Sequence, residues 1–266
     1  MQQMLATDNA IAILGLGMTG MSCARYFDSC GKSFVMFDED PAEQNVEDFS
    51  QQFPEHKLIV GALQEDDLVS FKTIVVSPGI ALDVPALRRA SVFGADITGD
   101  ISLFRNEVEV PIVAITGSNG KSTVTALLGE MAEQAGRKVA VGGNIGKPVL
   151  DLLLDDNDYD LYIVELSSYQ LERTACLAAN AAVVLNISPD HLDRYANMMA
   201  YHQAKHRIHR GCHYSVFNRA DKLTQPLPGK NTQLVSFGFS VPDLKQFGVD
   251  ASQEYLVCGP NKLMPV

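Results

Sequence analysis

PIVAITGSNGKST, residues 111–123, joins an apolar run to a glycine-rich turn that ends in Gly-Lys-Ser. A helical pattern follows the turn directly, over residues 121–135. In a strand, turn and helix of this kind, backbone N–H groups cradle phosphate oxygens, the lysine neutralises the β- and γ-phosphates, and the serine hydroxyl binds Mg²⁺. Residues 116–123, the phosphate loop, therefore predict a site for ATP or a close relative.

The phosphate loop departs from the strict GxxxxGK[ST] pattern at one position, where the chain has Ile115 in place of glycine. It is a variant that begins at Thr116-Gly117. We still predict a functional loop, because a buried lysine in a glycine turn has little structural purpose. The predicted nucleotide-binding residues are Thr116, Gly117, Ser118, Asn119, Gly120, Lys121, Ser122 and Thr123.

Short apolar runs alternate with amphipathic stretches on both sides of the phosphate loop. Strands are expected at residues 10–14, 33–37, 73–76, 111–115, 138–141, 161–164 and 182–185, and helices at 19–29, 85–90, 100–109, 121–135 and 196–209. Continuous apolar strands that alternate with helices are typical of parallel sheets buried on both faces.

We therefore predict an α/β protein with two domains. Residues 1–99 would form a Rossmann-like parallel-sheet domain, and residues 100–266 a P-loop ATPase-like parallel-sheet domain that binds ATP. After about Phe217 the chain changes to short strand-like pieces separated by Gly, Pro and Asn. These pieces predict a small antiparallel appendage.

A second glycine loop, GLGMTG at residues 15–20, follows the first expected strand and precedes a helix. This is GxGxxG in its required setting, where a phosphate would lie at the helix N-terminus. Asp38, at the end of the next strand, stands where a ribose hydroxyl would bind. Taken alone, the loop also fits an NAD(P)- or FAD-dependent oxidoreductase, or a tight turn without a ligand. A further turn, SPG at residues 77–79, follows another expected parallel strand.

Other expected strand ends carry groups suited to a hard metal ion and a substrate. Glu165 ends one strand and is followed by Ser167, and Asn186 ends the next, with His191 in the segment SPDHLD. The other histidines of this region, including His202, His206, His209 and His213, are expected on a solvated helix face.

Composition narrows the class of protein further. The 266 residues are 46% hydrophobic and 20% charged with a net charge of −11, which argues against nucleic acid or an anionic membrane surface as the main partner. The five cysteines are scattered, the N-terminus has no signal-peptide pattern, and no apolar run approaches the roughly 20 residues of a membrane span. We expect a cytoplasmic monomer without membrane insertion.

Four motifs together resemble the Mur ligases, the ATP-dependent amide-forming family of peptidoglycan synthesis. They are TGSNGKST at 116–123, GGNIG at 142–146, ELSSYQLE at 165–172 and NISPDHLDRY at 186–195. The resemblance covers essentially the whole chain. ELSSYQLE, together with GLGMTG and SPGI, is most similar to the family member that joins D-glutamate to UDP-N-acetylmuramoyl-L-alanine.

The resemblance implies that ATP phosphorylates the L-alanyl carboxylate and that the amine of D-glutamate attacks the acyl phosphate. The implied catalytic residues are Lys121, Glu165, His191 and Lys205, and the implied Mg²⁺ ligands are Ser122, Glu165, His191 and Lys205. In the family, the lysine matching Lys205 is carbamylated and so becomes a metal-binding carboxylate. The resemblance also implies that residues 1–99 form the domain that binds the UDP-substrate and that residues 100–266 form the central domain. The implied substrate contacts are Gly17, Met18, Thr19, Ser77, Pro78, Gly79, Asn144, Ser167 and His191.

The sequence departs from the family pattern in two places. The segment Phe37-Asp38-Glu39-Asp40 stands where an Asp, a Thr and a basic residue are expected beside the uracil. Nothing matches the HNxxN helix or the third α/β domain of full-length relatives, so the central domain is expected to be incomplete. We expect the chain to be a truncated form or a natural fragment and to be inactive alone. A non-catalytic nucleotide-binding module is the remaining alternative.

Overall fold

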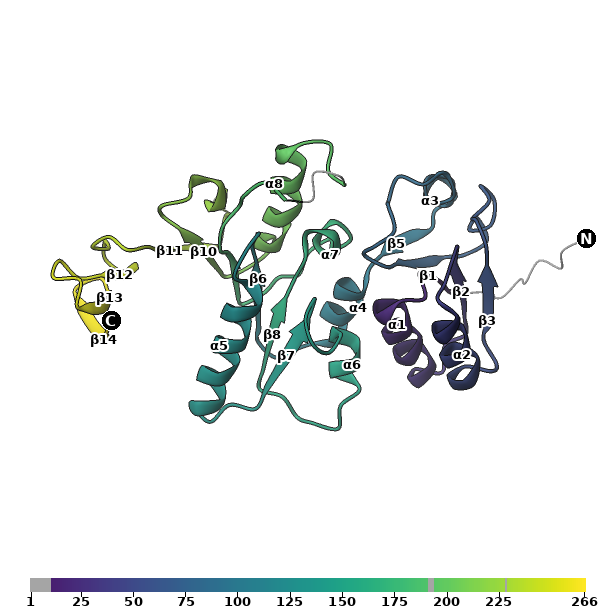
Figure 1. The fold of residues 1–266 in the computed structure, drawn as a ribbon, viewed down its shortest axis with the longest axis horizontal. Helices are drawn as coiled ribbons and strands as arrows, with labels where there is room; N and C mark the ends of the chain where they lie inside the picture. The colour runs from purple at the N-terminus through teal and green to yellow at the C-terminus, as the bar shows by residue number, and fades with distance from the viewer. Residues whose placement is uncertain (1–10, 191–193, 228) are drawn as a thin grey trace, which may run out of the picture. The chain divides into compact units, whose positions relative to one another are not determined.

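The computed structural model describes residues 11–190, 194–227 and 229–266. They divide into two compact units (Figure 1). The first contains the described residues of Met1–Glu107, with Lys147–Asp156 and Arg173–Ala175, and the second contains Val108–Gly146, Asn157–Glu172 and the described residues of Cys176–Val266. The units are interleaved in sequence, because two later segments belong to the first unit. The boundary expected at residue 99 stays a prediction.

The first unit is built on a five-stranded parallel sheet of order β3-β2-β1-β4-β5. Its strands are β1 (Ile11–Leu14), β2 (Phe34–Asp38), β3 (Lys57–Val60), β4 (Thr73–Val76) and β5 (Asp96–Thr98). The sequence predicted β1, β2 and β4 but missed the edge strands β3 and β5. An edge strand is partly exposed, so it lacks the continuous apolar run that marks a central strand.

The helices among the described residues of this unit are α1 (Met18–Ser29), α2 (Glu43–Gln52), α3 (Pro85–Val92), α4 (Asp100–Glu107) and α6 (Val149–Leu153). Helix α3 buries Leu87 in a cluster with Leu14 of β1 and Val76 of β4. Helix α6 packs against α1 and α4, where Arg25 donates to both carboxylate oxygens of Asp151 at 2.8 and 2.6 Å.

The second unit is built on a six-stranded parallel sheet of order β11-β10-β9-β6-β8-β7. Its strands are β6 (Ile112–Thr116), β7 (Val139–Gly143), β8 (Leu161–Glu165), β9 (Ala181–Val184), β10 (Tyr214–Asn218) and β11 (Gln233–Phe237). Strand β6 lies between β8 and β9, with Ile115 opposite Glu165 and Thr116 opposite Val184. The turn that follows β6 is therefore flanked by the carboxyl ends of two neighbouring strands.

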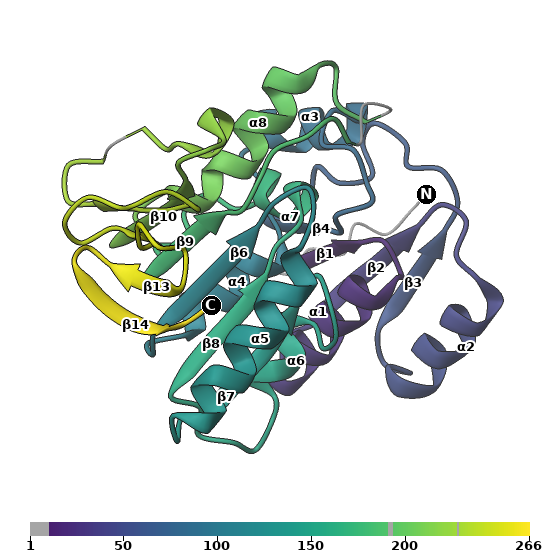
Figure 2. The same ribbon diagram turned by 60° about the vertical axis from the view of Figure 1, so that its left-hand side comes forward.

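The helices of the second unit are α5 (Lys121–Gln134), α7 (Ser168–Glu172) and α8 (Met198–His206), with the 3-10 turns η1 (Arg207–His209) and η2 (Lys222–Thr224). Helix α5 contacts β6, β7 and β8 (Figure 2). It approaches the sheet closely at Gly129, where an added Cβ would lie 2.8 Å from Val141. In the described part of the chain, no helix is long and apolar enough to cross a membrane.

The α/β class and the two parallel sheets are confirmed, and the predicted antiparallel appendage is present but begins later than expected. Strands β10 and β11, which flank Phe217, continue the parallel sheet. The antiparallel sheet consists of β12 (Phe247–Val249), β13 (Tyr255–Cys258) and β14 (Asn261–Pro265). Strands β10 and β11 were misjudged because they lie toward the edge of their sheet, and polar residues such as Ser215 and Ser236 interrupt their apolar runs.

Candidate phosphate-binding site

The phosphate loop connects the last residue of β6, Thr116, to the first residue of α5, Lys121. Gly120 is the N-cap of α5 and has φ of +77°, a left-handed conformation that glycine adopts without strain. No side chain of the described residues caps this helix. The first N–H groups of α5 and the positive end of its dipole therefore face the loop, as an anion site requires.

Two lysines bind the carbonyl groups of the phosphate loop. Lys121 Nζ donates to the Gly117 and Ser118 oxygens at 3.0 and 3.3 Å, and Lys205 Nζ, from α8, donates to the Gly117 oxygen at 2.8 Å. Lys205 is only 2% exposed, and its ammonium lies 4.7 Å from the centre of the Tyr201 ring. The site thus gathers two cationic side chains on one short turn.

Burial, together with the neighbouring charge of Lys121, lowers the pKa of Lys205 to about 7. The carboxylates of Asp190 and Glu165 oppose this effect without cancelling it. A lysine with such a pKa is partly neutral near pH 7, so its amine can act as a nucleophile.

Glu165 ends β8 on one side of the phosphate loop and is 1% exposed. Its Oε1 accepts a hydrogen bond from Asn144 Nδ2 at 3.0 Å, while Oε2 is buried without a hydrogen-bond partner among the described residues. A buried carboxylate oxygen without a donor is costly unless a cation meets it. The donor set therefore fits Mg²⁺ at Glu165.

Glu165 alone cannot complete the coordination of a cation, so other ligands are needed. The described residues contain no cluster of three or more carboxylate, imidazole or thiol groups arranged to hold a metal. Ser122, in the exposed first turn of α5, and the oxygens of a bound nucleotide are suitable additional ligands. His191, which was predicted as a metal and substrate ligand, lies outside the described residues.

Asn144 and Ser167, both predicted substrate contacts, have structural partners in the second unit. Asn144 donates to Glu165 with its side chain, and its backbone N–H donates to the Glu165 carbonyl at 2.8 Å. Ser167 precedes α7, and its hydroxyl accepts from the Gln170 N–H at 3.1 Å. Gln170 Oε1 in turn accepts from the Ser167 N–H at 3.1 Å, which makes a reciprocal helix cap. Their roles toward a substrate stay predictions.

On the other side of the phosphate loop, the segment after β9 makes hydrogen bonds to the loop that the sequence did not predict. Asn186 exchanges two hydrogen bonds with Asn119, and the Ser188 N–H donates to Ser118 Oγ at 3.0 Å. Asn186 was seen only as a strand end in the motif NISPDHLDRY. Its pairing with the loop could not be read from the sequence, because the partner lies 67 positions away.

In the first unit, the N-terminal glycine loop meets the turn at Ser77 as expected. The Ser77 N–H donates to the Leu14 carbonyl at 2.9 Å, and the Ser77 hydroxyl donates to the Gly15 carbonyl at 3.2 Å. Helix α1 begins at Met18, with Gly17 as an N-cap that no described side chain reaches. Since β1 and β4 are neighbours, the loop and the turn share one edge of the sheet, where α/β sheets bind ligands.

Asp38, the residue on which the oxidoreductase interpretation depends, is engaged with its own loop. Its Oδ2 accepts from the Leu16 N–H at 2.5 Å, and its Oδ1 accepts from the Asp40 N–H at 3.1 Å. The carboxylate thus tethers the N-terminal glycine loop to the end of β2. This use weakens its assignment to the ribose of a dinucleotide.

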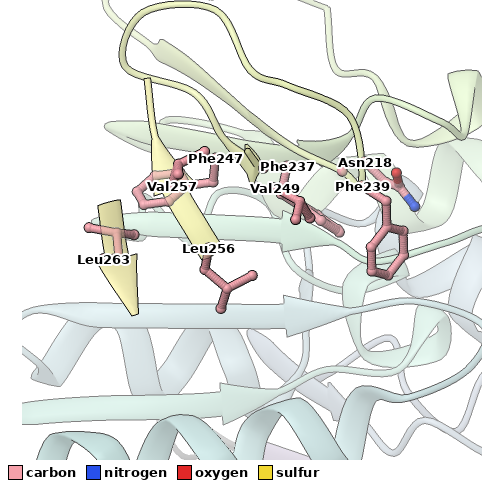
Figure 3. A pocket seen from close by; sticks show the side chains of 10 residues that line it. Asn218, Phe237, Phe239, Phe247, Val249, Leu256, Val257 and Leu263 are labelled. Atoms are coloured by element: carbon pink, nitrogen blue, oxygen red, sulfur yellow. The ribbon is translucent and has the colours of Figure 1, made fainter. Parts of the chain in front are cut away.

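A cavity of about 250 Å³ lies between β11 and the antiparallel sheet (Figure 3). Aromatic and aliphatic side chains line it, including Phe237, Phe247 and Val257, and Asn218 adds an amide. Its described lining residues include no lysine, arginine or carboxylate and none from the phosphate loop. Its chemistry does not suit a phosphate.

Comparisons with known proteins agree with this geometry. Residues 9–99 match the Mur ligase MurD-like N-terminal domain, and residues 115–258 match the Mur ligase middle domain. The chain is 47% identical over 265 residues to the UDP-N-acetylmuramoylalanine--D-glutamate ligase of Pseudomonas fluorescens strain Pf-5, covering 99% of this chain and 59% of that protein. It is 45% identical over 258 residues to the ligase of the same name from Legionella pneumophila strain Paris, covering 96% and 58%.

A solved structure shares the fold at low sequence identity. It is the UDP-N-acetylmuramate:L-alanyl-gamma-D-glutamyl-meso-diaminopimelate ligase from Neisseria meningitides, with a TM-score of 0.59 at 14% identity over 96% of this chain and 86% of that one. The chain spans about three fifths of the length of the curated relatives named above. Because two successive domain models account for most of its residues, the chain belongs to the Mur ligase family.

Proposed function

We propose that this chain carries the ATP site and the UDP-substrate site of a ligase that joins D-glutamate to UDP-N-acetylmuramoyl-L-alanine. The observation that carries the proposal is the phosphate loop, with Lys121 and Lys205 on its carbonyls and Glu165 beside it. The names of relatives at 45–47% identity supply the substrate class. The free state of all five cysteines supports the cytoplasm as the place of the reaction.

The reaction proceeds in two balanced steps. An oxygen of the L-alanyl carboxylate attacks the γ-phosphorus of ATP, the bond to the β–γ bridging oxygen breaks, and ADP leaves. The amine of D-glutamate then attacks the acyl carbon, the carbon–oxygen bond to phosphate breaks, and the amine loses a proton. Catalysis of such a phosphoryl transfer comes mainly from positioning of the reactants and neutralisation of their charge. Lys121, held at the loop by two carbonyl groups, is suited to neutralise the γ-phosphate.

Mg²⁺ fits the donor set of the second unit. Ser122 and Glu165 would hold one ion, and His191 and Lys205 a second, with Lys205 carbamylated. Carbamylation joins the neutral amine to carbon dioxide and releases a proton, and the lowered pKa of Lys205 supports it because a neutral fraction exists near pH 7. When bound, Mg²⁺ offsets negative charge on the transferring phosphate.

The diphosphate of the UDP-substrate would bind in the first unit. Gly17, Met18 and Thr19 form the open N-terminus of α1, and the turn at residues 77–79 meets the same loop. Met18 is 68% exposed, so a ligand can reach this turn. A helix N-terminus without a side-chain cap favours a diphosphate for the same electrostatic reason as the phosphate loop.

Calorimetry with separate ligands tests the proposal. We expect the chain to bind Mg²⁺-ATP and UDP-N-acetylmuramoyl-L-alanine, and Lys121→Ala to weaken ATP binding by about tenfold or more while leaving the UDP ligand unaffected. The matched control is Lys222→Ala, an exposed lysine of η2. Tight NADH binding, or no heat with the UDP ligand from folded protein, would contradict the proposal.

A further inference from the structure

We propose that Asn186 is a positioning residue for the phosphate loop. Its carboxamide fixes the peptide groups of Asn119, so that the N–H groups of the loop already face the position of a bound triphosphate. This inference rests on the proposed ATP site and adds a residue that acts through the backbone of the loop. It predicts a role for Asn186 in nucleotide affinity that is separate from its contribution to folding.

The contact between the two residues is reciprocal. The Asn119 N–H donates to Asn186 Oδ1 at 2.9 Å, and Asn186 Nδ2 donates to the Asn119 carbonyl at 2.9 Å. The Ser118 N–H also donates to the Asn186 carbonyl, at 3.0 Å. A single residue, Asn186, therefore forms hydrogen bonds with three backbone groups of the loop, at distances typical of good hydrogen bonds.

Asn186 is itself held firmly. The Leu185 N–H donates to the Thr116 carbonyl at 2.9 Å, which pairs the two strands up to the residue before it. On its other side, the Ile187 N–H donates to Asp221 Oδ2 at 3.0 Å. Because the backbone is hydrogen-bonded on both sides of Asn186, the position of its side chain is well fixed.

The phosphate loop needs such an external clamp because of its composition. Asn119 follows Gly117-Ser118 and precedes Gly120, which has φ of +77°. Glycine gives a turn the freedom to approach a phosphate, but that freedom must be lost when the ligand binds. A clamp that orders the loop beforehand removes part of this loss and increases affinity.

The chain offers a matched control at the opposite end of the same strand pair. Asn180, just before β9, accepts from the Ile112 N–H with its Oδ1 at 3.0 Å, and its own N–H donates to the Ile112 carbonyl at 2.8 Å. It is the same residue type, bonded to the backbone of the same strand β6, but at the amino end, away from the loop. Asn180→Ala therefore reports the purely structural cost of losing such a bond.

A first measurement needs no nucleotide. Amide hydrogen exchange of the ligand-free protein should show faster exchange at Asn119 in Asn186→Ala, whereas Asn180→Ala should leave Asn119 as in the unsubstituted protein. Unchanged exchange at Asn119 in Asn186→Ala would overturn the inference. Far-UV circular dichroism and urea unfolding, which report on both units, show that each variant is folded.

The second measurement is Mg²⁺-ATP affinity by calorimetry at several pH values. Asn186→Ala should lose roughly tenfold or more at every pH, since two backbone bonds are removed, and Asn180→Ala should bind as the unsubstituted protein does. The Mg²⁺-ATP affinity of Asn186→Asp should approach that of the unsubstituted protein as the pH falls. A protonated carboxyl group offers one acceptor and one donor, as the carboxamide does, whereas a carboxylate repels the Asn119 carbonyl.

The outcomes separate the inference from the proposed function. Equal ATP affinity in the unsubstituted protein and Asn186→Ala would overturn the inference and leave the ATP site standing. An equal loss in Asn180→Ala and Asn186→Ala would also overturn it, because the effect would then be general to folding. If the folded, unsubstituted protein did not bind Mg²⁺-ATP at all, the proposed function would fail and the inference with it.

Discussion

Replacing Lys205 with methionine is expected to stabilise this protein, although Lys205 belongs to its proposed catalytic site. The side chain is 2% exposed, and burial is the first cause that brings its pKa from 10.5 down to about 7. The charge of Lys121 is the second cause. A lysine whose pKa is lower in the folded state than in the unfolded state carries a charge that opposes folding.

The sign and size of the effect follow from these two pKa values. Between pH 7 and 10.5 the unfolded state binds more protons than the folded state, so stability rises with pH in that window. Below pH 7 the penalty is complete, at about 5 kcal/mol. By the same linkage about 3 kcal/mol of it remains at pH 8 and about 1 kcal/mol at pH 10.

Methionine removes this penalty and keeps a long, flexible side chain in the same space. It also loses the hydrogen bond from Nζ to the Gly117 carbonyl and the contact with the Tyr201 ring, which together offset about 1–1.5 kcal/mol. We therefore expect Lys205→Met to be more stable by about 2 kcal/mol at pH 8 and to differ little at pH 10.

Urea unfolding followed by far-UV circular dichroism measures the difference, since the chain has no tryptophan for fluorescence. The buffers should be free of carbon dioxide, so that the amine is not carbamylated. Lys230→Met, at an exposed position, is the control and should change stability little at either pH. Lower stability of Lys205→Met at pH 8, or the same difference at pH 8 and pH 10, would refute the reasoning.

Two further changes test other parts of the structure. Gly20→Ala places a Cβ 1.8 Å from the Gly15 carbonyl oxygen, so it should lower the free energy of unfolding in urea by about 2 kcal/mol or more and abolish binding of the UDP ligand. The control is Gly61→Ala, where an added Cβ has no atom within 4 Å and should affect stability only through the φ of +127°. Burial lowers the pKa of His209 to about 3, so between pH 6.5 and 3 the unfolded state binds one more proton than the folded state, and stability falls as the pH falls. His209→Gln should remove about 2 kcal/mol of the stability lost between pH 8 and pH 5, and an unchanged dependence of stability on pH would contradict this.

The sequence predicted the central strands, and the strand, turn and helix that contain the phosphate loop, because the signals are local. Strand β6 is a continuous apolar run, and the turn after it needs glycine and lysine at fixed positions. The position of Glu165 at a strand end followed from the same pattern. Where strands lie at a sheet edge, as β3 does, burial is partial and the local signal weakens.

The histidines of α8 and η1 show how packing defeats a local interpretation. They were expected on a solvated face, but His202 and His206 stack with ring centres 4.0 Å apart. His209 accepts from or donates to the Ser215 hydroxyl at 2.6 Å, a partner that belongs to β10. Because the sequence did not reveal β10 as a parallel strand, it could not show that this helical segment is covered.

Side-chain partners were the least predictable feature of the site. Asp38 was assigned to a ribose and Asn144 to a substrate, yet each binds a group that the fold brings from elsewhere. Leu16 and Glu165 are 22 and 21 positions away from them. Residue type indicates that such groups are polar and near a ligand, but only the register of the sheet decides which hydrogen bonds they make.

The charged groups around the phosphate loop are consistent with the proposed ligand, a nucleotide with its metal ion. Two ammonium groups, of Lys121 and Lys205, share one turn, and their repulsion is one reason why the pKa of Lys205 is low. Close by, Glu165 Oε2 is buried without a donor from the described residues. A simple anion would satisfy the lysines and leave Glu165 repelled, whereas a lone cation would do the reverse. A nucleotide phosphate that brings its own metal ion supplies both charges at once, so the complex fits this site better than either part alone.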